Sequence, residues 1–173
     1  FIVVTMESRH ESVQHRAGNL ACLAPLYDQI AAHAILSNAA EKLAVLARTH
    51  PSKDVRSGAA EVYVTNLKTG SLRATCVRNL SQMLGDKEQP VIEQIARIFT
   101  RWTDNDISEI KDLISLFVDA GIPLDEEREF GEFLWRIGMN DSDWAISLIA
   151  KSVEQNPITE GYRDGEYFIR FVL

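Results

Sequence analysis

Two stretches of this sequence repeat one pattern at a fixed distance, and that repeat constrains the fold more than any other feature. Residues 50–66, HPSKDVRSGAAEVYVTN, and 86–102, DKEQPVIEQIARIFTRW, each open with a turn rich in Asp, Lys and Pro and continue with apolar residues at helical spacing. A constant offset that preserves a buried face is typical of stacked helical repeats. The matched positions, all 36 residues apart, are Val55 and Val91, Ala59 and Ile95, Val62 and Ile98, Tyr63 and Phe99, Asn66 and Trp102.

Helical patterns separated by short turns continue along most of the chain, and they predict about eight helices of about 11 to 15 residues. Short turns favour antiparallel neighbours, and a constant period favours stacking the pairs in a line. The expected helices cover 20–30, the stretch from Ser37 or Asn38 (either can cap it) to Ala47, 54–67, 71–84, 90–102, 107–120, 125–137 and 143–153.

The beginning of the chain departs from this pattern. Residues 1–6 are apolar and β-branched, which predicts a short strand or an extended connector. Residues 7–18 are polar and predict a helix or a loop, so we treat 1–18 as an irregular lead-in. Leu20 opens the first apolar stripe, and Pro25 within it indicates that the regular helix starts near that proline.

Composition limits the partners that the chain can have. The sequence has 173 residues, 46% of them hydrophobic, with a net charge of −7. We therefore expect one globular domain, and binding to nucleic acid is less favoured than binding to protein. The absence of an apolar run of about 20 residues argues against a membrane span. Cys22 and Cys76 lie among apolar residues and predict buried thiols in a reducing, cytoplasmic setting.

No pattern in the sequence indicates catalysis, a cofactor or a metal. His10 and His15 lie on different faces of a helix, and phosphate-binding loops, nucleophile elbows and zinc-protease motifs are missing. The chain is therefore not expected to be an enzyme. Four carboxylates at the start of one expected helix complement its dipole instead: Asp125, Glu126, Glu127 and Glu129.

The two repeat copies resemble the HEAT-type helical repeats, with armadillo-like repeats as a close relation. The first copy carries the family's turn and helix-start residues as Pro51, Asp54, Val55, Arg56, Ala59 and Ala60, and the second as Asp86, Pro90, Val91 and Ala96, with Ile92 in place of the usual Arg. A third, looser copy runs through 123–137. The resemblance implies an all-α fold, a right-handed stack of antiparallel helix pairs (an α-solenoid), whose second helices line a concave surface.

Projection of those second helices predicts which side chains point away from the core. The predicted outward positions are Ser57, Glu61, Val64, Lys68, Glu93, Arg97, Thr100, Arg101, Arg128, Glu132, Trp135 and Arg136. Trp and Arg are typical anchors of protein interfaces. We therefore predict a partner-binding patch made of Arg97, Arg101, Arg128, Trp135 and Arg136.

Two alternatives remain open for this patch. Trp135 could pack between helices while the arginines pair with Glu93 and Glu132. The arginines could instead form a nucleic-acid surface. In the helix at 107–120, Ile114 and Val118 lie off the main apolar stripe, which runs through Leu113, Leu116 and Phe117. Burial from two sides explains this better than a partner contact.

The two ends of the sequence support further predictions. The sequence starts with Phe and stops within the apolar run 167–173, so we expect a piece of a longer protein. About four helix pairs would occupy 19–156, and 157–173 would begin a further unit or support self-association. The function that we expect is a protein-interaction scaffold or recognition module.

Overall fold

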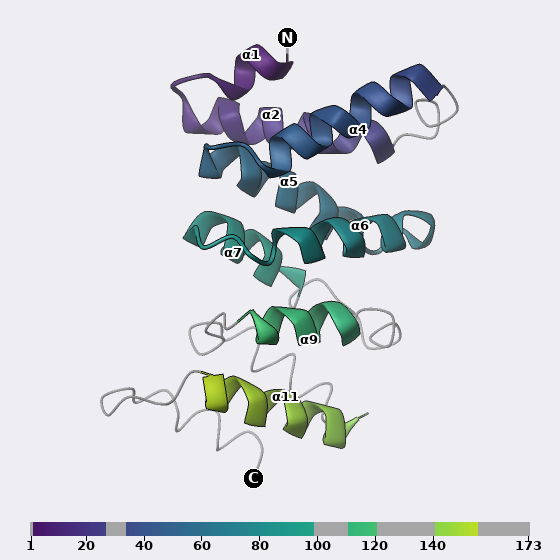
Figure 1. Cartoon of the computed structure of the whole chain (residues 1–173), viewed down its shortest axis with the longest axis vertical. Helices are drawn as coiled ribbons and strands as arrows, with labels where there is room; N and C mark the ends of the chain where they lie inside the picture. Colours follow the sequence, from purple (N-terminus) through teal and green to yellow (C-terminus); the bar gives the residue numbers. More distant parts are fainter. Residues whose placement is uncertain (1, 27–33, 99–110, 121–140, 156–173) are drawn as a thin grey trace. The chain divides into compact units, whose positions relative to one another are not determined.

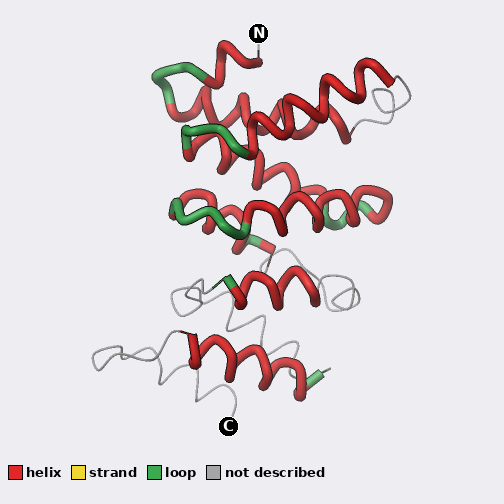
Figure 2. Tube along the Cα trace, viewed as in Figure 1, coloured by secondary structure: helices red, strands yellow, loops and turns green. Residues whose placement is uncertain are grey.

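The structure is a computed structural model that describes residues 2–26, 34–98, 111–120 and 141–155. Every regular element in these ranges is a helix (Figures 1 and 2), which confirms the all-α class. The right-handed stack of antiparallel pairs stays a prediction. By its contacts the chain divides into two compact units, Phe1–Arg97 and Ile98–Leu173, and each is described here by itself.

The first unit is organised around one helix, α5 (Lys53–Asn66). It contacts α2 (Glu11–Leu23), α4 (Ala34–Arg48), α6 (Gly70–Met83) and α7 (Gln89–Ala96). The unit also contains α1 (Ile2–Met6) and the short 3-10 turn η1 (Ala24–Leu26). Helices α2 and α7 both pack against α5, so side chains from three helices can gather around it.

Helix α5 begins where the sequence predicts a turn. The Ser52 hydroxyl accepts a hydrogen bond from the Asp54 backbone N–H at 3.3 Å and thereby caps the first turn. The repeat-face residues of this helix are buried, as predicted: Val55, Ala59, Val62 and Tyr63. Val91, Ile95 and Ile98 of the second copy are buried too.

The prediction that Ser57 and Val64 point away from the core is wrong. Both residues are 3% exposed. Helix α5 has packed neighbours on several sides, so positions opposite its main apolar stripe are also covered. Ser57 accommodates this burial by donating its hydroxyl to the Pro90 carbonyl at 3.1 Å.

Helices α2 and α5 cross with their backbones in contact, and two glycines make this possible. A Cβ atom placed on Gly18 would lie 2.0 Å from the Val55 carbonyl oxygen. A Cβ atom placed on Gly58 would lie 2.0 Å from the His15 carbonyl oxygen. Backbone atoms on a packed helix cannot move aside as a flexible side chain can, so this crossing requires glycine on both helices.

The N-terminal predictions need correction. Residues 2–6 form helix α1 rather than an extended segment, although β-branched residues favour strand. Tertiary contacts override that preference, because Met6 is fully buried and the Gln14 side-chain amide donates to the Met6 carbonyl at 3.1 Å. Residues 11–18, treated as part of an irregular lead-in but left open as a helix or a loop, are helical and belong to α2. This helix ends at Leu23, before Pro25, rather than starting near that proline.

Two further details of the first unit differ from expectation. Ser37 and Asn38 lie inside α4 and do not cap it, since the helix already runs from Ala34. Leu20, expected on a buried stripe, is 51% exposed. The buried side of α2 instead carries small residues, which the close crossing with α5 requires: Ala17, Gly18, Ala21 and Cys22.

The second unit is described in two helices, α9 (Lys111–Asp119) and α11 (Ser142–Gln155). Ile114 and Val118 are buried together with Leu113 and Phe117, so the predicted burial of these two residues is confirmed, and cover by neighbours on two sides of the helix stays a prediction. Leu116, expected in the buried stripe, is instead 45% exposed.

Polar contacts also connect these two helices. The Asp141 carboxylate accepts from the Trp144 backbone N–H at 3.2 Å, at the predicted start of α11. Hydrogen bonds from the Lys111 ammonium and from that N–H lower the pKa of Asp141. Lys151 forms a second ion pair, with Asp119 of α9. Lys111 and Lys151 therefore each join one helix to the carboxylate at or near the end of the other.

Candidate functional site

The strongest candidate site in the described part of the chain is a polar cluster contributed by three neighbouring helices. We define the three-helix polar cluster as His15 and Asn19 of α2, Glu61 of α5, and Arg97, which directly follows α7. His15 Nε2 lies 2.7 Å from Glu61 Oε2, and the Asn19 side-chain amide donates to the same oxygen at 2.9 Å. Glu61 therefore joins α2 to α5 through one carboxylate oxygen.

The environment of Glu61 stabilises its charged form. The hydrogen bonds from Asn19 and then from His15 lower the pKa of this carboxyl, and the positive charges of His15 and Arg97 act in the same direction. Desolvation raises the pKa of Glu61; its effect is smaller than that of either hydrogen bond but larger than that of either positive charge. Glu61 is one of the predicted outward positions, and 31% of its side chain is exposed. The cluster thus presents a fixed negative charge at the surface of the first unit.

Arg97 is the one residue of the predicted partner-binding patch that the structure describes. It is exposed, as is Glu93 one turn earlier, and both agree with the predicted outward positions. Arg101, Arg128, Trp135 and Arg136 lie outside the described residues, as do Thr100, Glu132 and the tail at 157–173. Whether the arginines and Trp135 gather on one surface stays a prediction.

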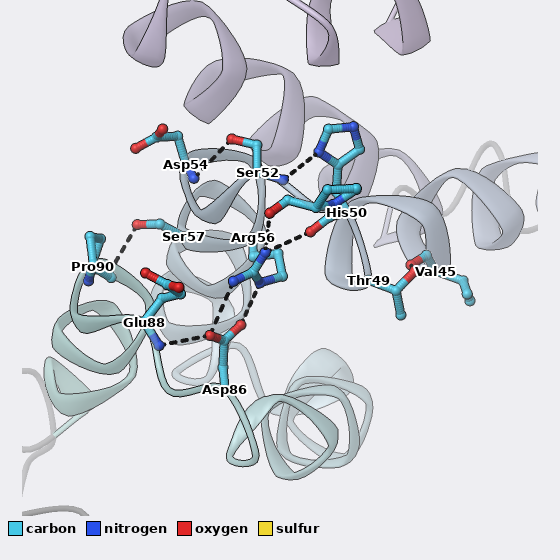
Figure 3. Close-up of polar contacts among 11 residues, drawn as sticks. Val45, Thr49, His50, Ser52, Asp54, Arg56, Ser57, Asp86, Glu88 and Pro90 are labelled. Atoms are coloured by element: carbon cyan, nitrogen blue, oxygen red, sulfur yellow. Dashed lines mark hydrogen bonds and ion pairs between the residues drawn. The ribbon is translucent and has the colours of Figure 1, made fainter.

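A second network of polar contacts holds the turn before α5 against the turn before α7 (Figure 3). Arg56 Nε donates to Asp86 Oδ2 at 2.5 Å and its Nη2 atom to Asp86 Oδ1 at 3.2 Å, which makes the pair bidentate. The two side chains are 15% and 11% exposed. Arg56 Nη1 also donates to the carbonyls of His50 and Pro51, at 2.7 and 2.8 Å.

Asp86 extends this network into the following turn. Its Oδ1 atom accepts from the Glu88 backbone N–H at 3.0 Å, immediately before α7 begins at Gln89. A single arginine thus fixes both turns, and the arrangement sets the position of α7 relative to α5. Arg56 and Asp86 are two of the residues that carry the HEAT resemblance, so the sequence pattern selected residues that do contact each other.

A second polar chain runs through the interior of the first unit. Arg48 Nη1 donates to the Tyr63 hydroxyl at 2.9 Å, and its guanidinium lies 5.9 Å from the centroid of that ring. The Cys22 thiol donates to the Ala44 carbonyl at 3.8 Å. These contacts join α2, α4 and α5. They satisfy polar groups that would otherwise be buried without partners.

Burial makes the two thiols less acidic than an exposed cysteine. It raises the pKa of Cys22 to about 11 and the pKa of Cys76 to about 11, and it also raises the pKa of Tyr63. Both thiols are free and buried, as the sequence predicted. At neutral pH they are protonated, so neither has the character of a reactive nucleophile.

These raised values predict a loss of stability in alkali. Between about pH 9 and 11 an unfolded chain releases thiol protons that the folded chain retains, so the free energy of unfolding falls as pH rises. The slope is about 1.4 kcal/mol per pH unit for each thiol. Urea denaturation at several pH values tests this, and Cys22→Ala should show a shallower slope. A pH-independent unfolding free energy up to about pH 10.5 would contradict the assignment.

The described residues were compared with the requirements of a metal site and of a membrane-spanning helix. Within the ranges that the structure covers, His, Cys, Asp and Glu side chains form no group of three or more that could hold a metal. Among the described helices, none combines the length and the apolar character that crossing a bilayer requires.

Sequence reasoning found Glu61 and Arg97 but missed His15 and Asn19. His15 lies in residues 7–18, which the sequence left open as a helix or a loop, and Asn19 follows that stretch and was not among the predicted site residues. The signal was present, because His15 and Asn19 are four residues apart with Gly18 between them, so one helix brings both donors to the same face. His15 had been considered only as a metal ligand.

Comparison of the chain with protein-family models, with curated proteins and with solved structures gave no significant match. The functional argument therefore depends on the residues and their geometry.

Proposed function

We propose that this chain is a HEAT-like recognition module that binds a protein or peptide partner and has no catalytic activity of its own. The observation that carries the proposal is the three-helix polar cluster, in which Glu61 of α5 binds His15 and Asn19 of α2 and the charge of the exposed Arg97, directly after α7, acts on Glu61. The buried free thiols support a reducing, cytoplasmic setting as part of the same proposal.

The proposal is supported by the rigid packing of the helices that carry these exposed charged side chains. The glycine crossing positions α2 against α5, and the Arg56–Asp86 pair positions the start of α7. Charged side chains on such a frame lose little conformational entropy when a partner binds, which favours affinity. In the HEAT family, surfaces lined by second helices of successive pairs are the binding surfaces, and α5 and α7 are the second helices in the pairing expected here.

Charge reversal of Arg97 tests this proposal. Arg97→Glu should weaken capture of the partner by about tenfold or more, since it replaces an interface cation by an anion next to Glu61. Capture on the immobilised chain from cell extract, quantified by mass spectrometry, gives the measurement. Arg78→Glu is the matched control, because Arg78 is an exposed arginine on α6 and should leave capture unchanged.

The same two variants distinguish the nucleic-acid alternative. Binding to DNA or RNA that falls steeply with salt and disappears in Arg97→Glu would identify a nucleic-acid module. Partner capture that is equal for the natural chain, Arg97→Glu and Arg78→Glu would remove this surface as the binding site.

A further inference from the structure

Helices α2 and α4 carry small residues on their buried sides and large apolar residues on their exposed sides, the reverse of the usual arrangement. The buried positions described in the two helices are Ala17, Gly18, Ala21, Cys22, Ala40, Ala44 and Ala47. Ile35, in contrast, is 85% exposed. The other exposed large apolar residues of the two helices are Val13, Leu20, Leu36, Val45 and Leu46. Exposed apolar residues gathered on neighbouring elements mark a contact with another molecule.

This exposure is confined to the beginning of the first unit. In α5, α6 and α7, no described apolar residue as large as valine is exposed. Helices α2 and α4 contact each other (Figure 1), and α5 packs against both of them. The exposed sides of α2 and α4 therefore face away from α5, where no described helix covers them.

Each of these two helices also places a cation between exposed apolar residues. The spacings are three and four residues on α2, and seven and four on α4, so the three side chains of each helix share one face. We define the α2–α4 outer surface as Val13, Arg16 and Leu20 of α2 with Ile35, Lys42 and Leu46 of α4.

The positive charge of this surface is not compensated within the described residues. Arg16 and Lys42 are exposed, and no ion pair among the described residues involves either of them. Glu41, next to Lys42 in the sequence, lies instead 3.8 Å from the Arg48 guanidinium. Two copies of this surface facing each other would bring like charges together, so charge favours an acidic partner over a second copy.

We propose that the α2–α4 outer surface binds an amphipathic α-helix of a partner protein that carries acidic residues beside its apolar face. Apolar residues at positions i, i+3, i+4 and i+7 of that helix would cover the exposed apolar side chains. Acidic residues at the margins of the same face would pair with Arg16 and Lys42. An anionic bilayer is a poorer match, because the chain has a net charge of −7. The surface shares no residue with the three-helix polar cluster, so this contact goes beyond the proposed function.

Three fluorescein-labelled peptides test this inference, each longer than about 15 residues so that a helix can form. The acidic peptide has Leu at the four helical positions and Glu at the margins of that face. The basic peptide has Lys in place of every Glu, and the shuffled peptide has the composition of the acidic one without the helical spacing. Fluorescence polarisation should show the acidic peptide binding about tenfold more tightly than either of the others. Equal binding of all three, or binding of none, overturns the proposal.

Single substitutions then locate the contact. Ile35→Ser and Leu20→Ser each remove an exposed apolar side chain and should weaken binding of the acidic peptide about tenfold. Ile146→Ser is the matched control, because Ile146 is exposed on α11, and it should leave binding unchanged. Lys42→Glu should abolish the preference for the acidic over the basic peptide, whereas Lys68→Glu, at another exposed lysine, should retain it.

Two other results would identify a different occupant and overturn the proposal. Binding to phosphatidylserine vesicles that falls in Ile35→Ser, without a preference for the acidic peptide, would indicate a bilayer. A dimer in sedimentation equilibrium that dissociates in Ile35→Ser, again without that preference, would indicate a second copy of this chain.

Discussion

Replacing Gly58 by alanine is expected to lower the free energy of unfolding of the first unit by about 3 kcal/mol or more. The added methyl group would lie 2.0 Å from the His15 carbonyl oxygen and 3.1 Å from the Asn19 side-chain oxygen. The main obstacle is backbone, so relief requires α2 and α5 to separate along their length. Urea denaturation followed by circular dichroism measures the loss.

The expected change in the free energy of unfolding is opposite in sign to the usual effect of replacing glycine by alanine in a helix. Glycine to alanine within a helix ordinarily stabilises by up to about 1 kcal/mol, because alanine restricts the unfolded chain. Gly70→Ala provides the control, since an added Cβ atom at Gly70 has nothing within 4 Å. That variant should be neutral or slightly stabilised. A Gly58→Ala protein as stable as Gly70→Ala would show that the two backbones are not in contact.

Arg56→Ala should cost about 3–5 kcal/mol, the range observed when one partner of a buried ion pair is removed. The substitution leaves the Asp86 carboxylate, which is 11% exposed, without its guanidinium, and it also leaves the His50 and Pro51 carbonyls without a donor. Because α7 is positioned through this pair, partner capture that depends on Arg97 should weaken as well.

A double-mutant cycle separates the ion pair from the loss of packing. Asp86→Ala alone should be nearly as harmful as Arg56→Ala, and the double variant should cost clearly less than the two single losses added together. Lys87→Ala, at an exposed position next to Asp86, should stay within about 0.5 kcal/mol of the natural protein. Strict additivity would mean that Arg56 and Asp86 act independently.

Helical spacing and turn chemistry in the sequence were sufficient to predict the class of fold and most of the helices described. The stretch from Ser52 to Asn66 shows why, because its cap, its apolar period and its end are all local properties. The beginning of the chain was predicted poorly for the opposite reason. Helix α1 depends on the burial of Met6 and on Gln14, and neither contact can be read from residues 1–6 alone.

The errors on individual faces have a common physical origin. A helical projection assumes one buried and one exposed side, whereas α5 has neighbours on several sides, so Ser57 and Val64 are covered. Leu20 is exposed because the glycine crossing selects the small-residue side of α2 for burial. For the candidate site, Glu61 and Arg97 were predictable from projection. Their neighbours His15 and Asn19 come from α2, most of which the sequence left open as a helix or a loop.

The glycine crossing also bears on the mechanical response of the first unit. Where two backbones touch, there are no intervening side chains whose rotamers could rearrange under load, so α2 and α5 should move as one stiff body. The junction between α5 and α7 is built instead from side chains such as Arg56, Asp86 and Ser57, which can yield by changing torsion angles. Elastic deformation of this unit should therefore concentrate at the α5–α7 junction, between Glu61 and Arg97.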